Sequence, residues 1–338
     1  YEQENCGIYP ELVERMSKLS GELFKQRKER KKPEGYYKSS DFNLLTEKGS
    51  YPLHSSASPG ILSLDIHKKQ TNYICTGGND GTAVVFDRNS EKVVCSLVNK
   101  QDDDKVTGVQ FTKNGILLTR HNGTVEYWKT DLLAGTCELK TQIHGLTGVV
   151  ASVHPLDPYF VHGVNHNSWG MFNMETGAKL CEISLEHDSD LTCVTVHPDG
   201  LMMATGSKDG KINVCDIRSK NIVATLEGHH SPITSLEFSE KGIHLVSVST
   251  KENIPLLHNL KKLNNQAQKL VHKQDSVIRG VDFDPYGAYI VSASDNNLYF
   301  YEVSNPETTL FQLEAHKDTV SNVKFSIDAG YIASVSQH

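Results

Sequence analysis

One repeated unit constrains the fold of this 338-residue chain more than any other feature. The stretch 191–217 alternates apolar and polar residues in short runs, which is the pattern of half-buried strands. Two turn sequences, His-Pro-Asp-Gly at 197–200 and Lys-Asp-Gly at 208–210, divide the stretch into three strands. Three strands cannot bury their own faces, so the unit needs neighbours of its own kind.

Copies of this unit occur at a nearly constant period. The residue pairs that end the third strand follow one another at steps of 42, 44, 43, 43 and 43 residues: Phe86-Asp87, Trp128-Lys129, Phe172-Asn173, Cys215-Asp216, His258-Asn259 and Tyr301-Glu302. A period of about 40–45 residues with Gly-His and Trp-Asp signatures is typical of WD40 propeller blades. The sequence therefore predicts an all-β fold, a seven-bladed WD40 β-propeller preceded by a short N-terminal α-helix.

The repeat divides the chain into three parts. Residues 59–338 form the propeller, with its last blade incomplete because the next Trp-Asp position would fall beyond His338. Residues 1–35 hold a helix and a basic run at the end of a coiled-coil region. Residues 36–58 form a linker with Pro, Gly and Ser clusters. We expect a strand within 42–55 to close the last blade, since propellers often take their outermost strand from the front of the repeat region.

The front segment, residues 9–32, is predicted to be helical. Leu12, Met16, Leu19 and Leu23 are spaced 4, 3 and 4 residues apart, which gives one apolar stripe. The stripe needs a partner, either the chain's own propeller or another chain in a longer coiled coil. Six of the eight residues 25–32 are Lys or Arg. This run indicates nuclear import or a nucleic-acid contact, and the alternative is a solvated helix end. We predict a nuclear protein.

Charge and cysteine content exclude several classes of protein. Of the net charge of −7, residues 1–50 contribute +1 (10 Lys and Arg, 9 Asp and Glu), so the remainder carries −8. An acidic propeller lacks the basic footprint of a general nucleic-acid binder, and we predict no direct nucleic-acid binding by it. The seven cysteines form no Cys-x-x-Cys, which argues against a zinc site or a disulfide framework. No apolar run approaches the roughly 18 residues of a membrane helix.

The search for catalytic motifs finds none, and we predict no catalytic, cofactor-binding or metal-binding residue. Instead, several polar residues recur at the blade period. Histidines before the first strand can bond a turn Asp such as Asp209, and Asp residues between the second and third strands are typical turn caps. Removal of Asp209 is expected to cost about 1–3 kcal/mol. The predicted structural positions are His187, Asp209, His229, Asp80 and Asp295, with Trp128 as inter-blade core.

Several stretches resemble one family beyond the general repeat. They are the lead-in 53–62 (Leu-His-Ser-Ser-Ala-Ser-Pro-Gly-Ile-Leu), Thr76-Gly77-Gly78, Val84-Val85-Phe86-Asp87, the pair 191–193 and 197–201, and Pro232-Ile233-Thr234-Ser235. The front segment agrees through Pro10-Glu11-Leu12 and the basic run 27–32. Together they resemble the pre-mRNA-processing factor nineteen family, the splicing-associated U-box ubiquitin ligases, over nearly the whole chain.

This resemblance implies an E3 ligase of the nineteen complex that acts in spliceosome activation and in DNA repair. It implies a U-box that recruits a charged E2, a tetramerising coiled coil, and a propeller that binds spliceosomal and complex partners and substrates. The chain contains no U-box and only the end of the coiled coil, so we expect it to be no enzyme and to bind no cofactor and no membrane. The alternatives are a WD40 scaffold or substrate receptor of another assembly, such as a cullin ligase, and an enzyme with polar residues converging in the central channel.

Overall fold

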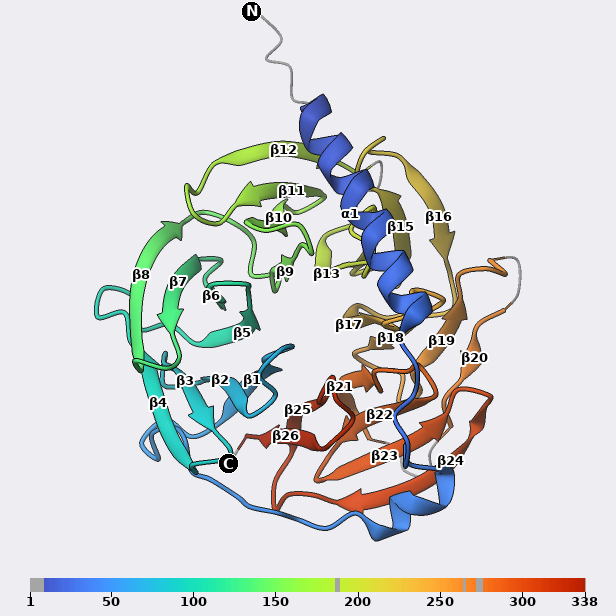
Figure 1. Ribbon diagram of the computed structural model, residues 1–338. Helices are drawn as coiled ribbons and strands as arrows, with labels where there is room; N and C mark the ends of the chain where they lie inside the picture. Colours follow the sequence, from blue (N-terminus) through green and yellow to red (C-terminus); the bar gives the residue numbers. More distant parts are fainter. Residues whose placement is uncertain (1–8, 186–188, 264–265, 272–275, 338) are drawn as a thin grey trace, which may run out of the picture.

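The fold is known from a computed structural model that describes residues 9–185, 189–263, 266–271 and 276–337. The chain begins with an α-helix, α1 (Pro10–Glu29), and a short 3-10 helix, η1 (Ser39–Leu44). All further regular elements are strands, and they form a ring around a central opening (Figure 1). Neither helix of the described residues is long and apolar enough to cross a membrane.

Six antiparallel four-stranded sheets, the blades, follow one another around the ring, with strands paired in chain order. In each blade the first strand lies nearest the centre (Figure 1). Blades 1 to 3 consist of β1 (Ile61–Ile66), β2 (Tyr73–Gly78), β3 (Ala83–Asp87), β4 (Lys92–Leu97), β5 (Val106–Phe111), β6 (Gly115–Arg120), β7 (Val125–Asp131), β8 (Thr136–Ile143), β9 (Ser152–Val153), β10 (Tyr159–Asn165), β11 (Ser168–Asn173) and β12 (Lys179–Ser184). Blades 4 to 6 consist of β13 (Leu191–Val196), β14 (Met202–Ser207), β15 (Ile212–Asp216), β16 (Ile222–Leu226), β17 (Ile233–Phe238), β18 (His244–Ser249), β19 (Leu256–Asn259), β20 (Gln268–Lys269), β21 (Ile278–Phe283), β22 (Tyr289–Ser294), β23 (Asn297–Glu302) and β24 (Asn305–Glu314).

A two-stranded hairpin lies between blade 6 and blade 1. It pairs β25 (Val320–Phe325) with β26 (Ile332–Ser336). The prediction of seven blades is therefore wrong: the described residues form six complete blades, and the last repeat contributes only this hairpin. The period of the sequence located the start of the last repeat, but it carries no information on whether outer strands pair with it.

The expected closing strand within 42–55 is also wrong. Residues 39–44 form η1, and residues 45–58 contain no strand. Instead, the side chain of His54 and the backbone N–H of Ser55 bind the carboxylate of Asp80 in blade 1. Side-chain contacts, and not strand pairing, therefore hold this segment to the ring. The ring closes through direct contacts between the hairpin and blade 1. Thr71 Oγ1 donates to Asp328 Oδ2 at 2.7 Å, and the guanidinium of Arg88 stacks on the ring of Tyr331.

Side chains on the innermost strands fasten each blade to the next. Asp65 Oδ2 on β1 accepts the backbone N–H of Phe111 on β5 at 2.7 Å, and Asp282 on β21 accepts that of Phe325 on β25 at the same distance. In the same way, Gln110 Oε1 accepts the backbone N–H of Val153 in blade 3 at 2.7 Å. Ser152 Oγ accepts the backbone N–H of Val196 in blade 4 at 3.0 Å. Because these acceptors recur at blade period, the wall of the channel is a chain of polar contacts between blades.

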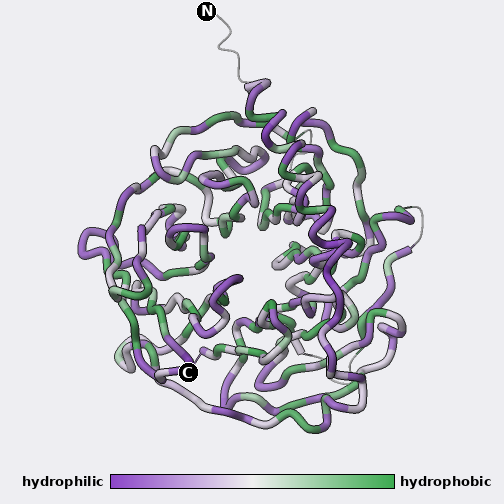
Figure 2. The backbone as a smooth tube through the Cα atoms, viewed as in Figure 1, coloured by the Kyte–Doolittle hydropathy of each residue, from purple (hydrophilic) through white to green (hydrophobic). Residues whose placement is uncertain are grey.

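The apolar core lies mainly between neighbouring blades. One cluster joins blades 1 and 2 through Cys75, Val85, Val109 and Leu118, and others join blades 4 and 5, 5 and 6, and blade 6 with the hairpin. Figure 2 shows the apolar stretches alternating with polar ones along the strands. Each sheet therefore buries both faces against its neighbours, which is what a repeat unit that cannot bury itself requires.

Tight turns between second and third strands depend on glycine at two clear positions. Gly81 and Gly210 have φ of +74° and +85°. A Cβ on Gly81 would lie 2.3 Å from the carbonyl oxygen of Asp103, and one on Gly210 would lie 2.6 Å from that of His229. Only glycine adopts this backbone conformation at little cost while leaving that space.

Candidate interaction face

Helix α1 crosses one face of the ring, here called the α1 face (Figure 1). At this face the first strand of each blade turns into the second. Leu12 and Met16 of α1 are 5% and 1% exposed and join a core cluster with residues of blades 3 and 4, including Trp169 and Met203. The sequence left two partners open for the apolar stripe, the chain's own propeller or another chain. In the structure the stripe packs on the chain's own propeller. Phe24, however, is 66% exposed and takes no part in this packing.

Two arginines of the basic run anchor the end of α1 to the propeller. Arg27 Nη1 donates to the backbone oxygen of Glu240 in blade 5 at 3.4 Å. Arg30 Nη2 donates to the backbone oxygen of Ile327 in the hairpin at 2.6 Å, and its guanidinium lies 4.8 Å from the ring centre of Tyr286 in blade 6. Guanidinium groups suit this combination of fork-like donation and aromatic stacking. Arginines in the run therefore have a structural use that the sequence alone did not indicate.

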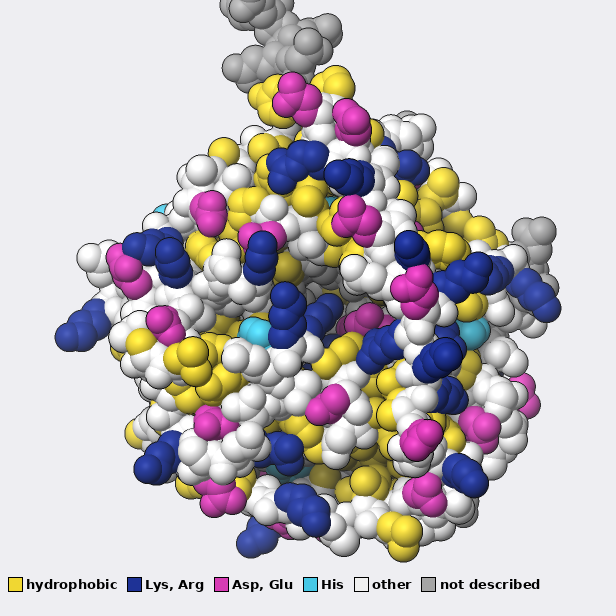
Figure 3. Space-filling model, in the orientation of Figure 1, with side chains coloured by type: hydrophobic (Ala, Val, Ile, Leu, Met, Phe, Trp, Pro, Cys, Tyr) yellow, Lys and Arg dark blue, Asp and Glu magenta, His cyan; other side chains and the backbone are white. Residues whose placement is uncertain are grey.

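The remaining cations of the run face solvent. Lys25, Lys28, Lys31 and Lys32 are exposed, and the ammonium of Lys32 lies 4.5 Å from the ring centre of Tyr36. Figure 3 shows basic side chains gathered along α1 and near the central opening on this face. The α1 face thus carries a local positive surface on a molecule that is acidic as a whole.

After α1, the chain is held to blade 6 by aromatic side chains. Tyr36 OH donates to the carboxylate of Asp284, and burial together with this carboxylate raises the pKa of Tyr36 well above its ordinary value. The ring of Tyr36 stacks on Tyr37 at 4.4 Å, and Phe42 of η1 is 4% exposed against Tyr289. We call residues 30–44 the strap, because they tie α1 to the outer part of the ring.

A groove of about 710 Å³ opens on the same face over blades 1 to 3, here called the open groove. The contacts of α1 given above go to blades 3 to 6 and the hairpin, so α1 does not fill it. Its lining combines apolar and basic side chains from three turns and from strand ends: His67, Gln70, Phe111, Lys113, Tyr127, Lys129, Leu132, Leu133 and Lys140. Leu133 is 88% exposed, the largest exposed fraction among the exposed large apolar side chains of the described residues.

The charges of the open groove favour an anionic ligand. Lys113 and Lys129 are exposed, whereas the ammonium of Lys140 pairs with Glu138 at 2.6 Å. Of the two acidic residues in the lining, Asp131 uses Oδ1 to accept the backbone N–H groups of Leu133 and Ala134 at 3.1 and 3.0 Å. Its carboxylate is therefore engaged in the turn that presents Leu133. Exposed lysines next to an apolar surface suit an acidic peptide with an apolar side chain better than a small substrate.

The predicted structural position Asp80 lies in a dense hydrogen-bonded cluster in blade 1. Asp80 Oδ1 is 3.0 Å from His54 Nδ1 and accepts Thr82 Oγ1 at 2.8 Å, while Oδ2 accepts the N–H of Ser55 at 2.9 Å. His54 Nε2 in turn lies 2.9 Å from Thr76 Oγ1. Burial raises the pKa of Asp80, but these hydrogen bonds outweigh the effect of burial and hold the pKa below its ordinary value. Sequence reasoning missed His54, which has in blade 1 the place that His229 has in blade 5.

His229 makes the same kind of cluster in blade 5, but with a different acid. His229 Nδ1 bonds the carboxylate of Glu252, and Nε2 lies 2.9 Å from Ser247 Oγ. The structure therefore brings His229 together with Glu252 of its own blade and not with Asp209 of blade 4. His187, another predicted structural position, lies outside the described residues.

The two other turn acids are exposed. Asp209 Oδ1 accepts Ser207 Oγ at 2.5 Å and the N–H of Lys211 at 3.3 Å. Asp295 has a φ of +48° at the β22–β23 turn, and its backbone oxygen accepts the N–H of Val320 at 2.6 Å. Asp295 thus shapes the turn mainly through its backbone.

We expect Asp80→Ala to lower the free energy of unfolding by about 2 kcal/mol and Asp209→Ala by about 1 kcal/mol, since the carboxylate of Asp80 is largely buried and that of Asp209 is exposed. Urea unfolding of both variants measures the difference. Asp80→Asn, which keeps one acceptor, should lie between Asp80→Ala and wild type. An Asp80→Ala variant with the stability of wild type would contradict the structural role.

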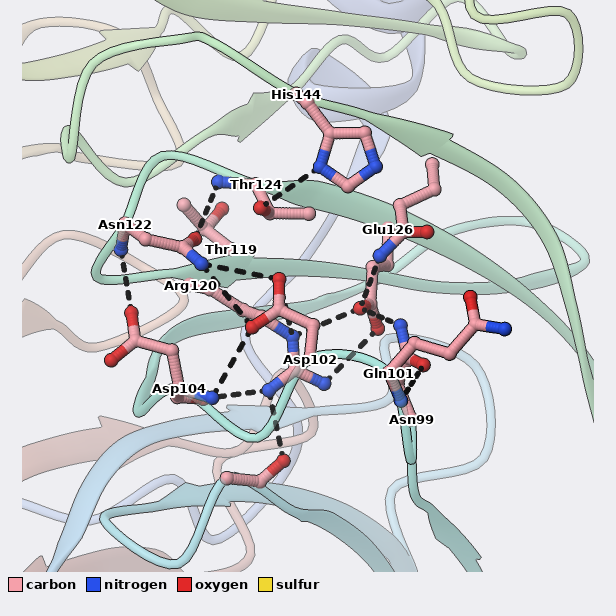
Figure 4. A network of polar contacts seen from close by, with 12 residues as sticks. Asn99, Gln101, Asp102, Asp104, Thr119, Arg120, Asn122, Thr124, Glu126 and His144 are labelled. Carbon is pink, nitrogen blue, oxygen red and sulfur yellow. Dashed lines mark hydrogen bonds and ion pairs between the residues drawn. The ribbon is translucent and has the colours of Figure 1, made fainter.

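Blade 2 replaces the histidine cluster by a buried ion pair, shown in Figure 4. Arg120 and Glu126 are both 0% exposed, and Arg120 Nε donates to Glu126 Oε1 at 2.9 Å. Arg120 Nη1 also donates to the backbone oxygens of Gly81 and Asp104 at 3.0 and 2.6 Å. Arg120 therefore links blade 2 to the turn of blade 1. Sequence reasoning missed this pair, although Arg120 stands where blades 4 to 6 have Ser207, Ser249 and Ser294.

Trp128 lies at the same junction. It is 6% exposed within the cluster between blades 1 and 2, and its Nε1 donates to Glu126 Oε2 at 2.8 Å. Asn99 from the end of blade 1 donates to Glu126 Oε1 at 2.8 Å. The carboxylate of Glu126 is thus the acceptor that organises the seam between blades 1 and 2. Among the described residues no group of three His, Cys, Asp or Glu side chains could hold a metal ion.

Comparison with known proteins gives two related results. Residues 134–338 match the family described as "Nucleolar protein 10-like, N-terminal domain", a β-propeller. Over its length the chain is 31% identical to pre-mRNA-processing factor 19 homolog 2 of Arabidopsis thaliana, covering 97% of this chain and 62% of the relative. It is 30% identical to pre-mRNA-processing factor 19 of Oryza sativa, with 97% and 63% covered, and 30% identical to that of Homo sapiens, with 98% and 65% covered.

The chain spans slightly less than two thirds of the length of these curated relatives. Among solved structures, the β-propeller domain of Myceliophteria thermophila Cps50 (Swd1) superposes with a TM-score of 0.70, covering 82% of this chain and 94% of that one. The sequence identity is 16%, so this likeness concerns the fold alone.

Proposed function

Because the chain belongs to the pre-mRNA-processing factor 19 family, and its residues 134–338 to the nucleolar protein 10-like propeller family, we propose that it recruits proteins for a splicing-associated E3 ubiquitin ligase. The observation that carries this proposal is the length of the alignment. It covers 97–98% of the chain and therefore includes α1 and the basic run as well as the propeller. A generic propeller scaffold would share only the repeats.

The proposal assigns binding to this chain and ubiquitin transfer to a U-box elsewhere in the full-length protein. The chain holds no catalytic domain, and its buried polar clusters serve to hold single blades together or to join neighbouring blades. Its partners would be proteins of the spliceosome and of the nineteen complex, together with ubiquitination substrates, and its site of action the nucleus. Roles in spliceosome activation and DNA repair, and homo-oligomerisation through a coiled coil, belong to the same proposal. The alternative is a propeller scaffold or substrate receptor of a different assembly.

The open groove is the surface that we assign to partner binding. Its occupant is an acidic segment of a protein partner that inserts an apolar side chain beside Leu133. Lys113 and Lys129 would meet its carboxylates, while Phe111 and Leu132 extend the apolar floor. Charge complementarity of this kind raises association rates and selects partners.

The test compares partners captured from nuclear extract by the full-length protein and by a Lys113→Glu, Lys129→Glu variant. We expect at least a tenfold loss of a subset of splicing proteins, identified by quantitative mass spectrometry. The matched control is Lys251→Glu, Lys317→Glu, which changes two exposed lysines on the opposite face without touching the groove. Unchanged capture by the groove variant would reject the groove. Capture of a different assembly, without splicing proteins, would favour the alternative function.

A further inference from the structure

Two cysteine side chains meet at the outer seam between blades 1 and 2. Cys95 lies on β4, the outermost strand of blade 1, and Cys137 lies on β8, the outermost strand of blade 2. The thiol of Cys137 donates to the backbone oxygen of Ser96, next to Cys95, at a distance of 3.3 Å. The Cys137 thiol also lies near enough to Cys95 to raise its pKa. Forty-two residues of sequence separate them, so the fold brings them together.

The backbones of the two strands lie in direct contact at this seam. A Cβ built on Gly135, two residues before Cys137, would lie 3.1 Å from the backbone oxygen of Val94, the neighbour of Cys95. The main chains therefore approach each other closely beside Val94, while the Cys137 thiol contacts the backbone on the other side of Cys95, at Ser96. A disulfide requires Cα atoms about 4.4–6.8 Å apart, so it can form only between strands in direct contact, as β4 and β8 are.

The two thiols differ in their access to solvent. Cys137 is half-buried at the rim of the cluster between blades 1 and 2, whereas Cys95 is 8% exposed within it. Burial and the neighbouring Cys137 raise the pKa of Cys95 to about 12. Because the thiolate is the reactive form, this difference makes Cys137 the thiol that meets an oxidant first. The other cysteines of the described residues, Cys75, Cys181, Cys193 and Cys215, are buried.

We propose that Cys95 and Cys137 form a reversible disulfide across the seam when the protein meets a hydroperoxide such as hydrogen peroxide. The Cys137 thiolate attacks one peroxide oxygen, the O–O bond breaks, and the released hydroxide takes a proton to become water. Cys95 then attacks the resulting sulfenic acid, its proton leaves with the second hydroxide, and the S–S bond replaces the S–O bond. Two thiols and one peroxide give one disulfide and two waters, and a thiol reductant reverses the reaction.

The experiment oxidises the reduced full-length protein with hydrogen peroxide, blocks the remaining thiols with an alkylating reagent, and digests it with trypsin. We expect mass spectrometry to find the tryptic peptides 93–100 and 130–140 linked, with a mass two hydrogens below the sum of the two peptide masses. The oxidised protein should migrate as a monomer on a denaturing gel without reductant, which shows that the link lies within one molecule. Dithiothreitol should separate the two peptides. The wild-type protein suffices for this result, so it does not depend on the folding of any variant.

Variants assign the chemistry to the two thiols. Cys95→Ser should leave Cys137 as a sulfenic or sulfinic acid, and Cys137→Ser should leave Cys95 reduced at the same peroxide dose. Cys181→Ser is the matched control and should form the link as wild type does. Over-oxidation of Cys137 in wild type without the linked peptide, or a link only between two molecules, would overturn the proposal.

Discussion

Replacing Glu126 by alanine is expected to lower the free energy of unfolding by about 3–5 kcal/mol, because the guanidinium of Arg120 stays buried without its counter-charge. Both side chains are fully buried, and Trp128 Nε1 and Asn99 Nδ2 would lose the same acceptor. Urea unfolding followed by far-UV circular dichroism measures the change through the transition midpoint and its slope. The effect should exceed that of removing an exposed carboxylate of the same blade.

Two controls separate the buried pair from charge in general. Glu138→Ala removes a carboxylate that pairs with Lys140 at 2.6 Å on the exposed edge of the same blade, and it should cost no more than about 0.5 kcal/mol. The double variant Arg120→Leu, Glu126→Leu removes both charges and should be more stable than Glu126→Ala alone. If Glu126→Ala and Glu138→Ala have equal stability, the pair does not hold the seam.

The ring itself could be predicted from the sequence, because the spacing of third-strand ends reports a repeated unit that must pack on its neighbours. The same spacing located the turn acids, and the structure places Asp80 in a hydrogen-bonded cluster as a turn residue. The number of complete blades could not be predicted, since pairing of outer strands depends on segments without periodicity. The hairpin β25–β26 pairs as the first two strands of a complete blade do, so nothing within it indicates that outer strands are missing.

The candidate site was predicted less well than the fold. Arg120 and Glu126 are six residues apart on paired strands, but a polar pair in a strand sequence looks the same whether it faces water or a neighbouring blade. The open groove combines residues from three blades, and no spacing in the sequence reports that proximity. The lead-in 53–62 has no regular alternation, so no strand pattern marks His54 as part of a blade.

Phe42→Ala is the second substitution with a large expected effect, about 3–5 kcal/mol of unfolding free energy. Phe42 lies in η1, 4% exposed, with its ring 4.8 Å from that of Tyr289 and 5.0 Å from that of Phe300. Truncation would leave a cavity between blade 6 and the strap. Aromatic pairing adds to the loss of buried area. Thermal and urea unfolding of the purified variant give the measurement.

Leu44→Ala is the matched control, because Leu44 lies in the same 3-10 helix but is 75% exposed, and its removal should cost less than about 0.5 kcal/mol. The comparison separates the buried anchor of the strap from an exposed position in the same helix. A strap without backbone pairing depends on its anchoring side chains, so its stability should be concentrated in Phe42. Equal, small effects of the two substitutions would show that the strap does not stabilise the ring.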